Sequence, residues 1–242
     1  MREKRRRGFL FASFGFVLRT LVPNQLWCIE EAMPMLGLQF GARLTVARLH
    51  DDNLWVHAPF AISNADEAAI REQGEVAHIV APNSFHFKEI GEFTRRFPDA
   101  QLWVVPALAT KLDEIPHLPL HSLPPDWTQD FDGVLFDAAL GYEEWIFCHR
   151  ATRSLILTDL VLNVPRPDNP LGRITAAILD EGRGCKSSRL VRATIYGGRD
   201  LKQARGYVNQ VLRWDFKRIV MAHGDIVPRD GKRVLRRALR WI

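Results

Sequence analysis

Glu144-Trp-Ile-Phe-Cys-His149 and Ser154-Leu-Ile-Leu-Thr158 are two short apolar runs separated only by residues 150–153. Runs of this length and composition are typical of buried strands, and so short a connection joins two strands as an antiparallel hairpin. Residues 42–49 and 54–58 repeat the arrangement around the turn Asp51-Asp-Asn53. A doubly wound parallel sheet needs a helical crossover between most consecutive strands, so the two hairpins argue against it.

The remaining elements alternate between strands and helices. One helix is expected after the N-cap residue Ser63, ending near Gly74, and a second over residues 87–97, where apolar residues have helical spacing. Further strands are predicted at residues 25–29, 78–81, 101–105, 133–136 and 217–221, and further helices at residues 174–180, 200–214 and 232–242. Two strand-rich regions, each followed by helices, predict an α/β fold in which two sheets face each other with helices outside, an αββα four-layer sandwich.

The composition indicates one large globular domain, which we place at residues 21–242. The chain has 242 residues, of which 47% are hydrophobic and 25% charged, and this suffices for one sizeable core. Cys28, Cys148 and Cys185 are odd in number and widely spaced, so they predict neither a disulfide framework nor a thiolate zinc site. A reducing compartment is the simpler interpretation, and we expect a cytoplasmic location.

Residues 1–20 form a basic and apolar leader that we expect to lie outside the core. Residues 2–7 are strongly basic and residues 8–18 are apolar, but the apolar run is too short to span a bilayer and no signal-peptide cleavage site follows it. Peripheral attachment of this leader to a membrane surface is the alternative. No transmembrane span is expected elsewhere in the chain.

The net charge of +5 is divided unevenly along the chain. Residues 1–20 carry 6 Lys/Arg and 1 Asp/Glu, residues 21–181 carry 11 and 23, and residues 182–242 carry 16 and 4, which gives +5, −12 and +12. The basic C-terminal region either neutralises the acidic body of the same molecule or meets an anionic partner. Because no nucleic-acid-binding motif accompanies it, we expect the first role and keep nucleic acid as the alternative partner.

Three polar residues stand where apolar strands are expected to end. His86 closes Val80-Ala-Pro-Asn-Ser-Phe-His86, Asp159 closes Leu155-Ile-Leu-Thr-Asp159, and His223 closes Ile219-Val-Met-Ala-His223. Functional side chains of α/β proteins gather at the ends of strands. A fold that brings these strand ends together would make the three residues one site.

The residues around these positions resemble a known family. The resemblance runs from about residue 23 to residue 242 and rests on blocks that occur in order: Leu54-Trp-Val-His-Ala-Pro59, Val80-Ala-Pro-Asn-Ser-Phe-His86, Phe97-Pro-Asp-Ala100, Gly141-Tyr-Glu-Glu144, Phe147-Cys-His-Arg150, Leu155-Ile-Leu-Thr-Asp-Leu160 and Ala222-His-Gly-Asp225. The chain is similar to an uncharacterised bacterial family, a domain of unknown function related to the metallo-β-lactamase superfamily, which has no assigned reaction. The resemblance implies an αββα sandwich of metallo-β-lactamase type, with its site in the cleft at one edge of the two sheets.

The resemblance also implies a degenerate metal site. The superfamily's first metal-binding segment reads His-x-His-x-Asp-His, whereas Asn83-Ser-Phe-His-Phe-Lys-Glu89 offers one histidine, and Phe87 stands where relatives in the narrower family have a second. The superfamily's next histidine would fall near residues 139–142, where there is none. Asp159 matches the superfamily's Gly-Asp type block, and His223 matches its last histidine.

A binuclear zinc site usually has about five to seven side-chain ligands, so this chain predicts a reduced site with one divalent metal, zinc, iron or manganese. The expected ligands are His86, Asp159 and His223, with a water. Bound metal would lower the pKa of that water toward about 7, and the protein would hydrolyse an ester, amide or phosphoester. The expected catalytic proton acceptors are Asp225 and Glu144. Asn83, Glu143, Glu144 and Asp225 are reserve ligands.

The alternative is a fold retained without metal. The three residues would then hydrogen-bond one another, and the protein would be a non-catalytic binding protein for a small-molecule or anionic ligand in the cleft. A nuclease is a third hypothesis, prompted by the basic C-terminal region, although the metal pair for phosphodiester cleavage is incomplete. His57 and His149 are interpreted as structural histidines.

Overall fold

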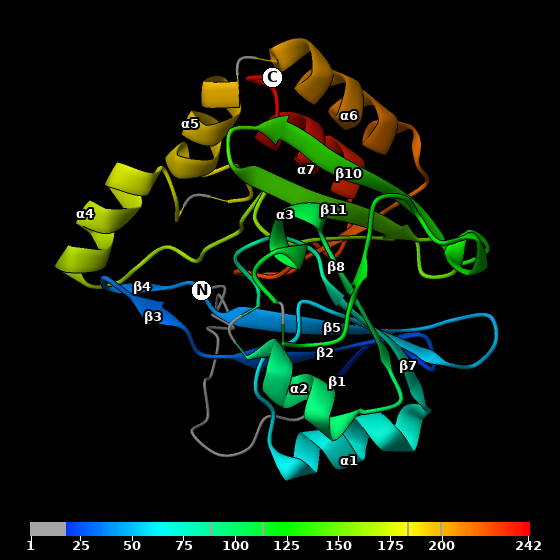
Figure 1. Ribbon diagram of the computed structural model, residues 1–242. Coiled ribbons are helices and arrows are strands. Elements are labelled where there is room, and N and C mark those ends of the chain that lie inside the picture. The colour runs from blue at the N-terminus through cyan, green and yellow to red at the C-terminus, as the bar shows by residue number, and fades with distance from the viewer. Residues whose placement is uncertain (1–17, 88, 113, 183, 199) are drawn as a thin grey trace.

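The computed structural model describes residues 18–87, 89–112, 114–182, 184–198 and 200–242. Two β-sheets face each other and helices cover their outer surfaces, as the predicted αββα four-layer sandwich requires (Figure 1). The helices outside the first sheet are α1 (Asn64–Gln73) and α2 (Ile90–Arg96), and those outside the second are α5 (Arg189–Gly198), α6 (Leu201–Arg213) and α7 (Gly231–Ala238).

The first sheet has the strand order β1-β2-β5-β6-β7-β8-β9. Its strands are β1 (Arg19–Val22), β2 (Leu26–Glu31), β5 (Ala42–Arg48), β6 (Leu54–His57), β7 (Val76–Ala81), β8 (Gln101–Val104) and β9 (Leu118–Pro119). Strands β1, β2, β5 and β6 pair antiparallel, which includes the predicted β5–β6 hairpin. From β6 onward the strands pair parallel, because α1, α2 and the short α3 (Pro106–Ala109) provide the crossovers.

The second sheet has the strand order β10-β11-β12-β13. Its strands are β10 (Phe131–Ala139), β11 (Tyr142–His149), β12 (Ser154–Leu157) and β13 (Arg218–Met221). The first three form the predicted antiparallel meander. Strand β13 pairs parallel with β12 after the chain has passed through α4 (Pro170–Leu179), α5 and α6. The carboxyl ends of β12 and β13 therefore lie at the same edge of the sheet.

Local signals explain the elements that the sequence predicts. Helix α1 begins with a capping box, in which the Ser63 hydroxyl accepts the backbone N–H of Asp66 at 3.1 Å and the Asp66 carboxylate accepts the backbone N–H of Ser63 at 3.2 Å. Six features were not predicted: β1, β9, α3, α5, the 3₁₀ turn η1 (Pro125–Trp127) and the hairpin of β3 (Pro34–Met35) and β4 (Leu38–Gln39). Helix α5 buries only Val191 and Ile195, and its last two residues, Gly197-Gly198, have low helix propensity, so few local signals mark it in the sequence.

The main core lies between the two sheets and is rich in aromatic side chains. Trp55 of the first sheet packs against Phe147 of the second at 4.9 Å between ring centroids, and against Phe131 at 4.6 Å. All three side chains are fully buried. Aromatic contacts of this kind stabilise the stacking of the two sheets, and with it the edge at which the strand ends meet.

The predicted leader, residues 1–20, lies outside the described residues except for its last three. Strand β1 begins within those three, at Arg19. In the described part of the chain, no helix combines the length and the apolar character needed to cross a bilayer.

Candidate functional site

The position of Asp159 is fixed by the buried carboxylate of Glu144. Strand β12 ends at Leu157, and the next three backbone N–H groups all point at Glu144 on the neighbouring strand β11. Thr158 and Asp159 donate to Glu144 at 2.6 and 3.0 Å, and Leu160 donates at 2.9 Å. Glu144 thus satisfies backbone groups that leave the sheet without a strand partner, and it turns the chain so that Asp159 faces the edge.

Asn83 joins the loop that carries His86 to the loop that carries Asp159. Its amide nitrogen donates to the Thr158 hydroxyl at 2.8 Å and to Asp159 Oδ2 at 2.7 Å. Its amide oxygen accepts the backbone N–H groups of Phe85 and His86, both at 3.0 Å. The side chain is fully buried, so these bonds are made out of water, where losing one is costly. Asn83, a reserve ligand from the sequence, therefore positions two of the predicted ligands.

His223 is held from the first sheet. It follows β13, and its Nδ1 lies 2.6 Å from the Gly41 carbonyl oxygen just before β5. A carbonyl only accepts, so Nδ1 carries the proton and Nε2 is the nitrogen that faces the site.

The buried guanidinium of Arg43, in β5, holds the backbone on both sides of His223. It donates to the Met221 carbonyl and, at 2.7 Å, to the Gly224 carbonyl. The charge of Arg43 is balanced by Glu30 of β2, which accepts from Nε at 2.8 Å. Arg43 is 3% exposed, and a buried cation needs such a partner. The first sheet thereby positions a residue that follows the second.

Gly224 lets this loop approach its neighbour closely. Its φ is +78°, and an added Cβ would stand 2.2 Å from the Asn163 carbonyl oxygen. Only glycine fits such a conformation and such a contact without a shift of the backbone.

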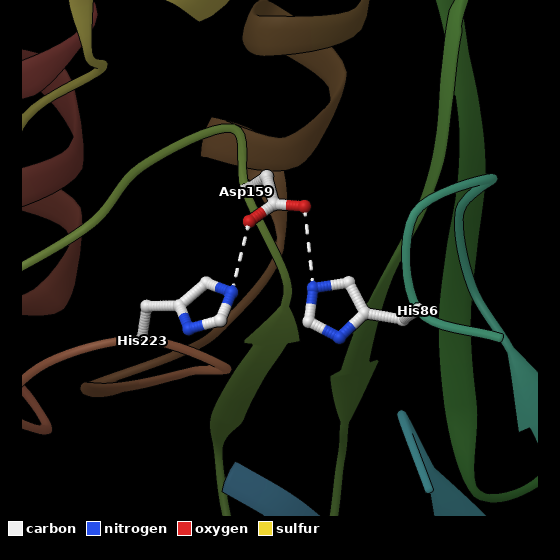
Figure 2. A group of neighbouring side chains, drawn as sticks. All are labelled: His86, Asp159 and His223. Carbon is white, nitrogen blue, oxygen red and sulfur yellow. Dashed lines mark ion pairs between the residues drawn. The ribbon is translucent and has the colours of Figure 1, made fainter. Parts of the chain in front are cut away.

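His86, Asp159 and His223 come together at this edge. The imidazole rings of the two histidines point toward Asp159 (Figure 2). His86 Nε2 lies 3.3 Å from Asp159 Oδ2, and His223 Nε2 lies 3.3 Å from Asp159 Oδ1. One ligand atom from each residue lies within 4.8 Å of the others. The structure thus gathers the three predicted ligands from three loops that are far apart in sequence.

The electrostatics favour an ionised Asp159. Burial alone would raise the pKa of Asp159, but the charge and hydrogen bonds of His86 and His223 lower it well below its usual range. Burial would lower the pKa of His223, yet the hydrogen bond with Asp159, with the charge of that carboxylate, raises it. The site therefore holds a carboxylate in contact with two imidazole groups.

This donor set fits a divalent metal. Two imidazole nitrogens and one carboxylate oxygen are a common three-ligand set for zinc and for iron, and they leave positions open for water or substrate. The bond from His223 Nδ1 to Gly41 fixes the tautomer whose Nε2 lone pair can bind a metal, as an outer partner of a ligating histidine should. Asn83 is an outer partner of Asp159, because its amide nitrogen donates to the Asp159 carboxylate and orients it.

A cleft of about 650 Å³ opens over the three residues. Its wall is mostly apolar, and its charged residues other than the three are Glu31, Arg43 and Glu89. The volume lies within the range of small-molecule binding sites in proteins.

The other predicted residues lie outside this cleft. Burial and, to a smaller extent, the charge of Asp159 raise the pKa of Glu144 to about 8. Both carboxyl oxygens of Glu144 accept hydrogen bonds from the backbone N–H groups described above. Asp225 is bonded through its backbone to Asn163, and burial raises the pKa of its carboxyl. Neither residue lines the cleft. Glu143 accepts the backbone N–H of Ala107 at 3.0 Å. Their predicted roles in proton transfer stay predictions.

The two histidines interpreted as structural are buried. His57 is 1% exposed and stacks on Trp55, with ring centroids 5.4 Å apart, and burial lowers its pKa to about 3. His149 accepts or donates a hydrogen bond with the Thr152 hydroxyl at 3.0 Å. Both therefore belong to the core.

Sequence reasoning missed the charged groups around the site, above all Arg43, Glu30 and Glu181. Glu181 is 3% exposed, and neither of its carboxylate oxygens has a hydrogen-bond partner among the described residues. Burial raises its pKa to about 8, against the opposing effect of Lys186. No local pattern distinguishes these residues from surface charges, because their burial depends on segments distant in sequence.

Replacing Asn83 with alanine should loosen the site without abolishing the fold. We expect the affinity for Zn²⁺, measured by titration against a competing chelator, to fall about 10- to 100-fold, because the outer partner of Asp159 and His86 is lost. The matched control is Asn209→Ala, since Asn209 lies exposed on α6. Equal affinities in the two variants would show that Asn83 does not position the ligands.

Glu181 should make stability depend on pH. Its folded pKa of about 8 lies above the ordinary value of 4.5, so its protonated form stabilises the fold at low pH, and the free energy of unfolding falls as the pH rises through this interval. The charged groups around it are Asp180, Lys186, Arg192 and His223. Urea unfolding measures this as the free energy of unfolding of Glu181→Gln minus that of the unsubstituted protein. Between pH 5 and pH 9 this difference should rise by roughly 3 kcal/mol in favour of the variant. A difference that stays constant with pH would contradict this.

Solved structures with the same architecture are metalloproteins by their names. A metallo-β-lactamase from Pontibacter korlensis has a TM-score of 0.59 with 10% identity, over 93% of this chain and 97% of its own. The metallo-β-lactamase FIM-1 from Pseudomonas aeruginosa, in its mono-zinc form, has a TM-score of 0.56 with 11% identity, over 94% and 96%. The metal-soaked Flv1 flavodiiron core from Synechocystis sp. PCC6803 has a TM-score of 0.59 with 12% identity, over 90% and 58%. At these identities the likeness concerns the fold.

The sequence itself matches one family. No curated protein matches the chain, but residues 23–181 match the family model for DUF4336, a domain of unknown function. This confirms the resemblance to an uncharacterised family, and the solved structures confirm the predicted metallo-β-lactamase fold. The chain belongs to the DUF4336 family, and it has the metallo-β-lactamase fold with a His86, Asp159 and His223 group that is a candidate metal site.

Proposed function

We propose that this protein binds one divalent metal, zinc, iron or manganese, through His86, Asp159 and His223 and hydrolyses an ester, amide or phosphoester. The observation that carries the proposal is the convergence of these three side chains, with one ligand atom of each within 4.8 Å of the others, on the floor of a cleft. A bound metal would polarise the scissile group and lower the pKa of a bound water toward about 7.

The residues of the chain prepare the site for this role. Asn83 and Glu144 hold the Asp159 loop, and Arg43 and Gly41 hold His223, so the ligands are fixed before a metal arrives. Such preorganisation favours binding because less side-chain freedom is lost. For Glu144 this is a positioning role, exerted through the backbone of Asp159.

The number of ligand clusters supports a site for one metal ion rather than two. Among the described residues, no second cluster of three metal-ligating side chains accompanies this one. One of the similar structures, FIM-1 from Pseudomonas aeruginosa, is described in a mono-zinc form, so a protein of this fold can hold one zinc.

Hydrolysis also needs a proton acceptor near the reacting water. The predicted acceptors, Asp225 and Glu144, do not line the cleft, so we extend the proposal to Glu31 and Glu89, which do. These carboxylates are the only ones besides Asp159 in the described cleft wall. A carboxylate there has access to a reacting water without having to leave a hydrogen-bond network inside the core.

The second candidate is a non-catalytic binding protein. Asp159 is already partnered on both oxygens, by His86 and Asn83 on one side and by His223 on the other. These contacts satisfy the buried carboxylate without an ion, which is the observation that favours this role. We further propose a cytoplasmic location, which is supported by the three free cysteines.

Elemental mass spectrometry on untagged protein tests the first candidate. We expect about one zinc, iron or manganese per chain, and we expect both His86→Ala and His223→Ala to lose it, because each removes one of three protein ligands. The matched control is His121→Ala, since His121 is exposed and lies outside the site.

Circular dichroism of all three variants separates ligand loss from unfolding. Full metal content in His86→Ala or His223→Ala would overturn the metal assignment. Metal-free protein, with its fold intact after growth and dialysis with each metal, would favour the binding protein instead.

A further inference from the structure

The cleft over the three residues is lined mainly by large apolar side chains. They come from loops that follow strands of both sheets, from β3, and from α4 and α5: Met33, Met35, Phe60, Phe85, Phe87, Leu162, Leu179, Leu190 and Val191. Phe85 is 59% exposed and stacks on Tyr142, with ring centroids 6.1 Å apart, and Leu190 is 67% exposed. Side chains of this kind are normally buried, so their gathering in one cleft marks a binding surface.

Two elements that help to line the cleft, α4 through Leu179 and the β3–β4 hairpin through Met35, carry further exposed apolar side chains. Leu171, Ile174 and Ile178 are each more than half exposed and lie one helical turn or two apart on α4. Leu36, in the turn of the hairpin, is 65% exposed. The hairpin and α4 lie side by side, since the Thr175 hydroxyl donates to the Leu36 carbonyl at 2.8 Å (Figure 1).

Most of the large exposed apolar residues therefore belong to the cleft or to the α4 and β3–β4 elements beside it. Ten large apolar side chains are exposed among the described residues, and seven of them belong to the cleft or to these elements: Met35, Leu36, Phe85, Leu171, Ile174, Ile178 and Leu190. Exposed apolar residues that are scattered singly need no explanation, but seven that lie in the cleft or on two elements that help to form it do.

The charges in the cleft wall are acidic rather than basic. Glu31 and Glu89 line the wall, and they are close enough for the Glu89 charge to raise the pKa of Glu31 in addition to burial. Arg43 also reaches the cleft, but its charge is balanced by Glu30 at 2.5 Å. An anionic group that enters the cleft would meet the two carboxylates of Glu31 and Glu89, and their repulsion favours an uncharged small molecule over the anionic ligand that the sequence keeps as the other alternative.

We infer that the cleft takes the long apolar acyl chain of an uncharged ester or amide, with the scissile carbonyl placed over His86, Asp159 and His223. The hydrolysis in this inference rests on the proposed function. The binding of an acyl chain rests only on the shape and lining of the cleft. In the hydrolysis, a water oxygen forms a bond to the carbonyl carbon and the bond to the alcohol oxygen or amine nitrogen breaks. One proton of the water passes to the leaving alcohol or amine, the other is released to solvent, and the acyl chain ends in a carboxylate.

The binding half of the inference is tested on metal-free protein. Nile red, an uncharged dye that fluoresces in apolar surroundings, should bind, and 1-hexanol, 1-octanol and 1-decanol should displace it with an affinity that rises about fourfold for each added methylene. Leu190→Asp and, as a second variant, Phe85→Ser should weaken binding at least about tenfold. Both side chains are more than half exposed, so these substitutions leave the core intact.

The matched control is Leu140→Asp. Leu140 is 68% exposed, close to the value for Leu190, but it does not line the cleft. Equal weakening in Leu140→Asp and Leu190→Asp would overturn the inference, as would an affinity for alcohols that does not depend on chain length.

The reaction half is tested on metal-loaded protein with 4-nitrophenyl butyrate and 4-nitrophenyl octanoate. The octanoate should have the higher kcat/KM, and Leu190→Asp should lower kcat/KM for the octanoate at least tenfold and lower that for the butyrate by a smaller factor. No hydrolysis of either ester, with chain-length-dependent alcohol binding retained, would reject the proposed function and keep the apolar ligand. Hydrolysis with no preference for the longer chain would reject the acyl-chain inference and keep the hydrolase.

Discussion

The site depends on one buried carboxylate. Glu144 is fully buried in β11 and accepts three consecutive backbone N–H groups from the residues that follow β12. Without this acceptor those groups would be unpaired, because β12 has ended at Leu157 and the residues after it leave the ladder with β11. The turn that Glu144 enforces is the turn that presents Asp159, and both histidines are oriented toward Asp159.

The site also exists only because the two sheets pack face to face. His86 follows a strand of the first sheet, whereas Asp159 and His223 follow strands of the second. Three contacts cross between the sheets at this edge: Asn83 bonds Asp159, Gly41 bonds His223, and Arg43 bonds the backbone on either side of His223. The apolar core below them, with Trp55 against Phe147, stabilises the same arrangement. The packing of the two sheets against each other thus also determines where His86, Asp159 and His223 lie.

Much of the fold could be predicted from the sequence, because hairpins, strand ends and helix caps are local patterns. The runs around residues 150–153, the capping residue Ser63 and the three polar strand ends each carry their signal within a few residues. The bonds of Arg43 to the loop after β13, by contrast, join residues about 180 positions apart, and no sequence pattern announces them. The cleft at this edge was expected from the family resemblance, but its apolar wall with two glutamates was not, since that wall is assembled from loops of both sheets and from α4 and α5.

X-ray absorption spectroscopy at the metal edge, on protein loaded with one equivalent of Zn²⁺, tests the central claim most directly. If His86, Asp159 and His223 bind the metal, the spectrum will show imidazole scattering from two histidines, with nitrogen and oxygen neighbours at about 2.0–2.2 Å. In His223→Ala the same spectrum should lose one imidazole. A spectrum without imidazole scattering, or one that is unchanged in His223→Ala, would contradict the account and leave the three residues as a hydrogen-bonded group.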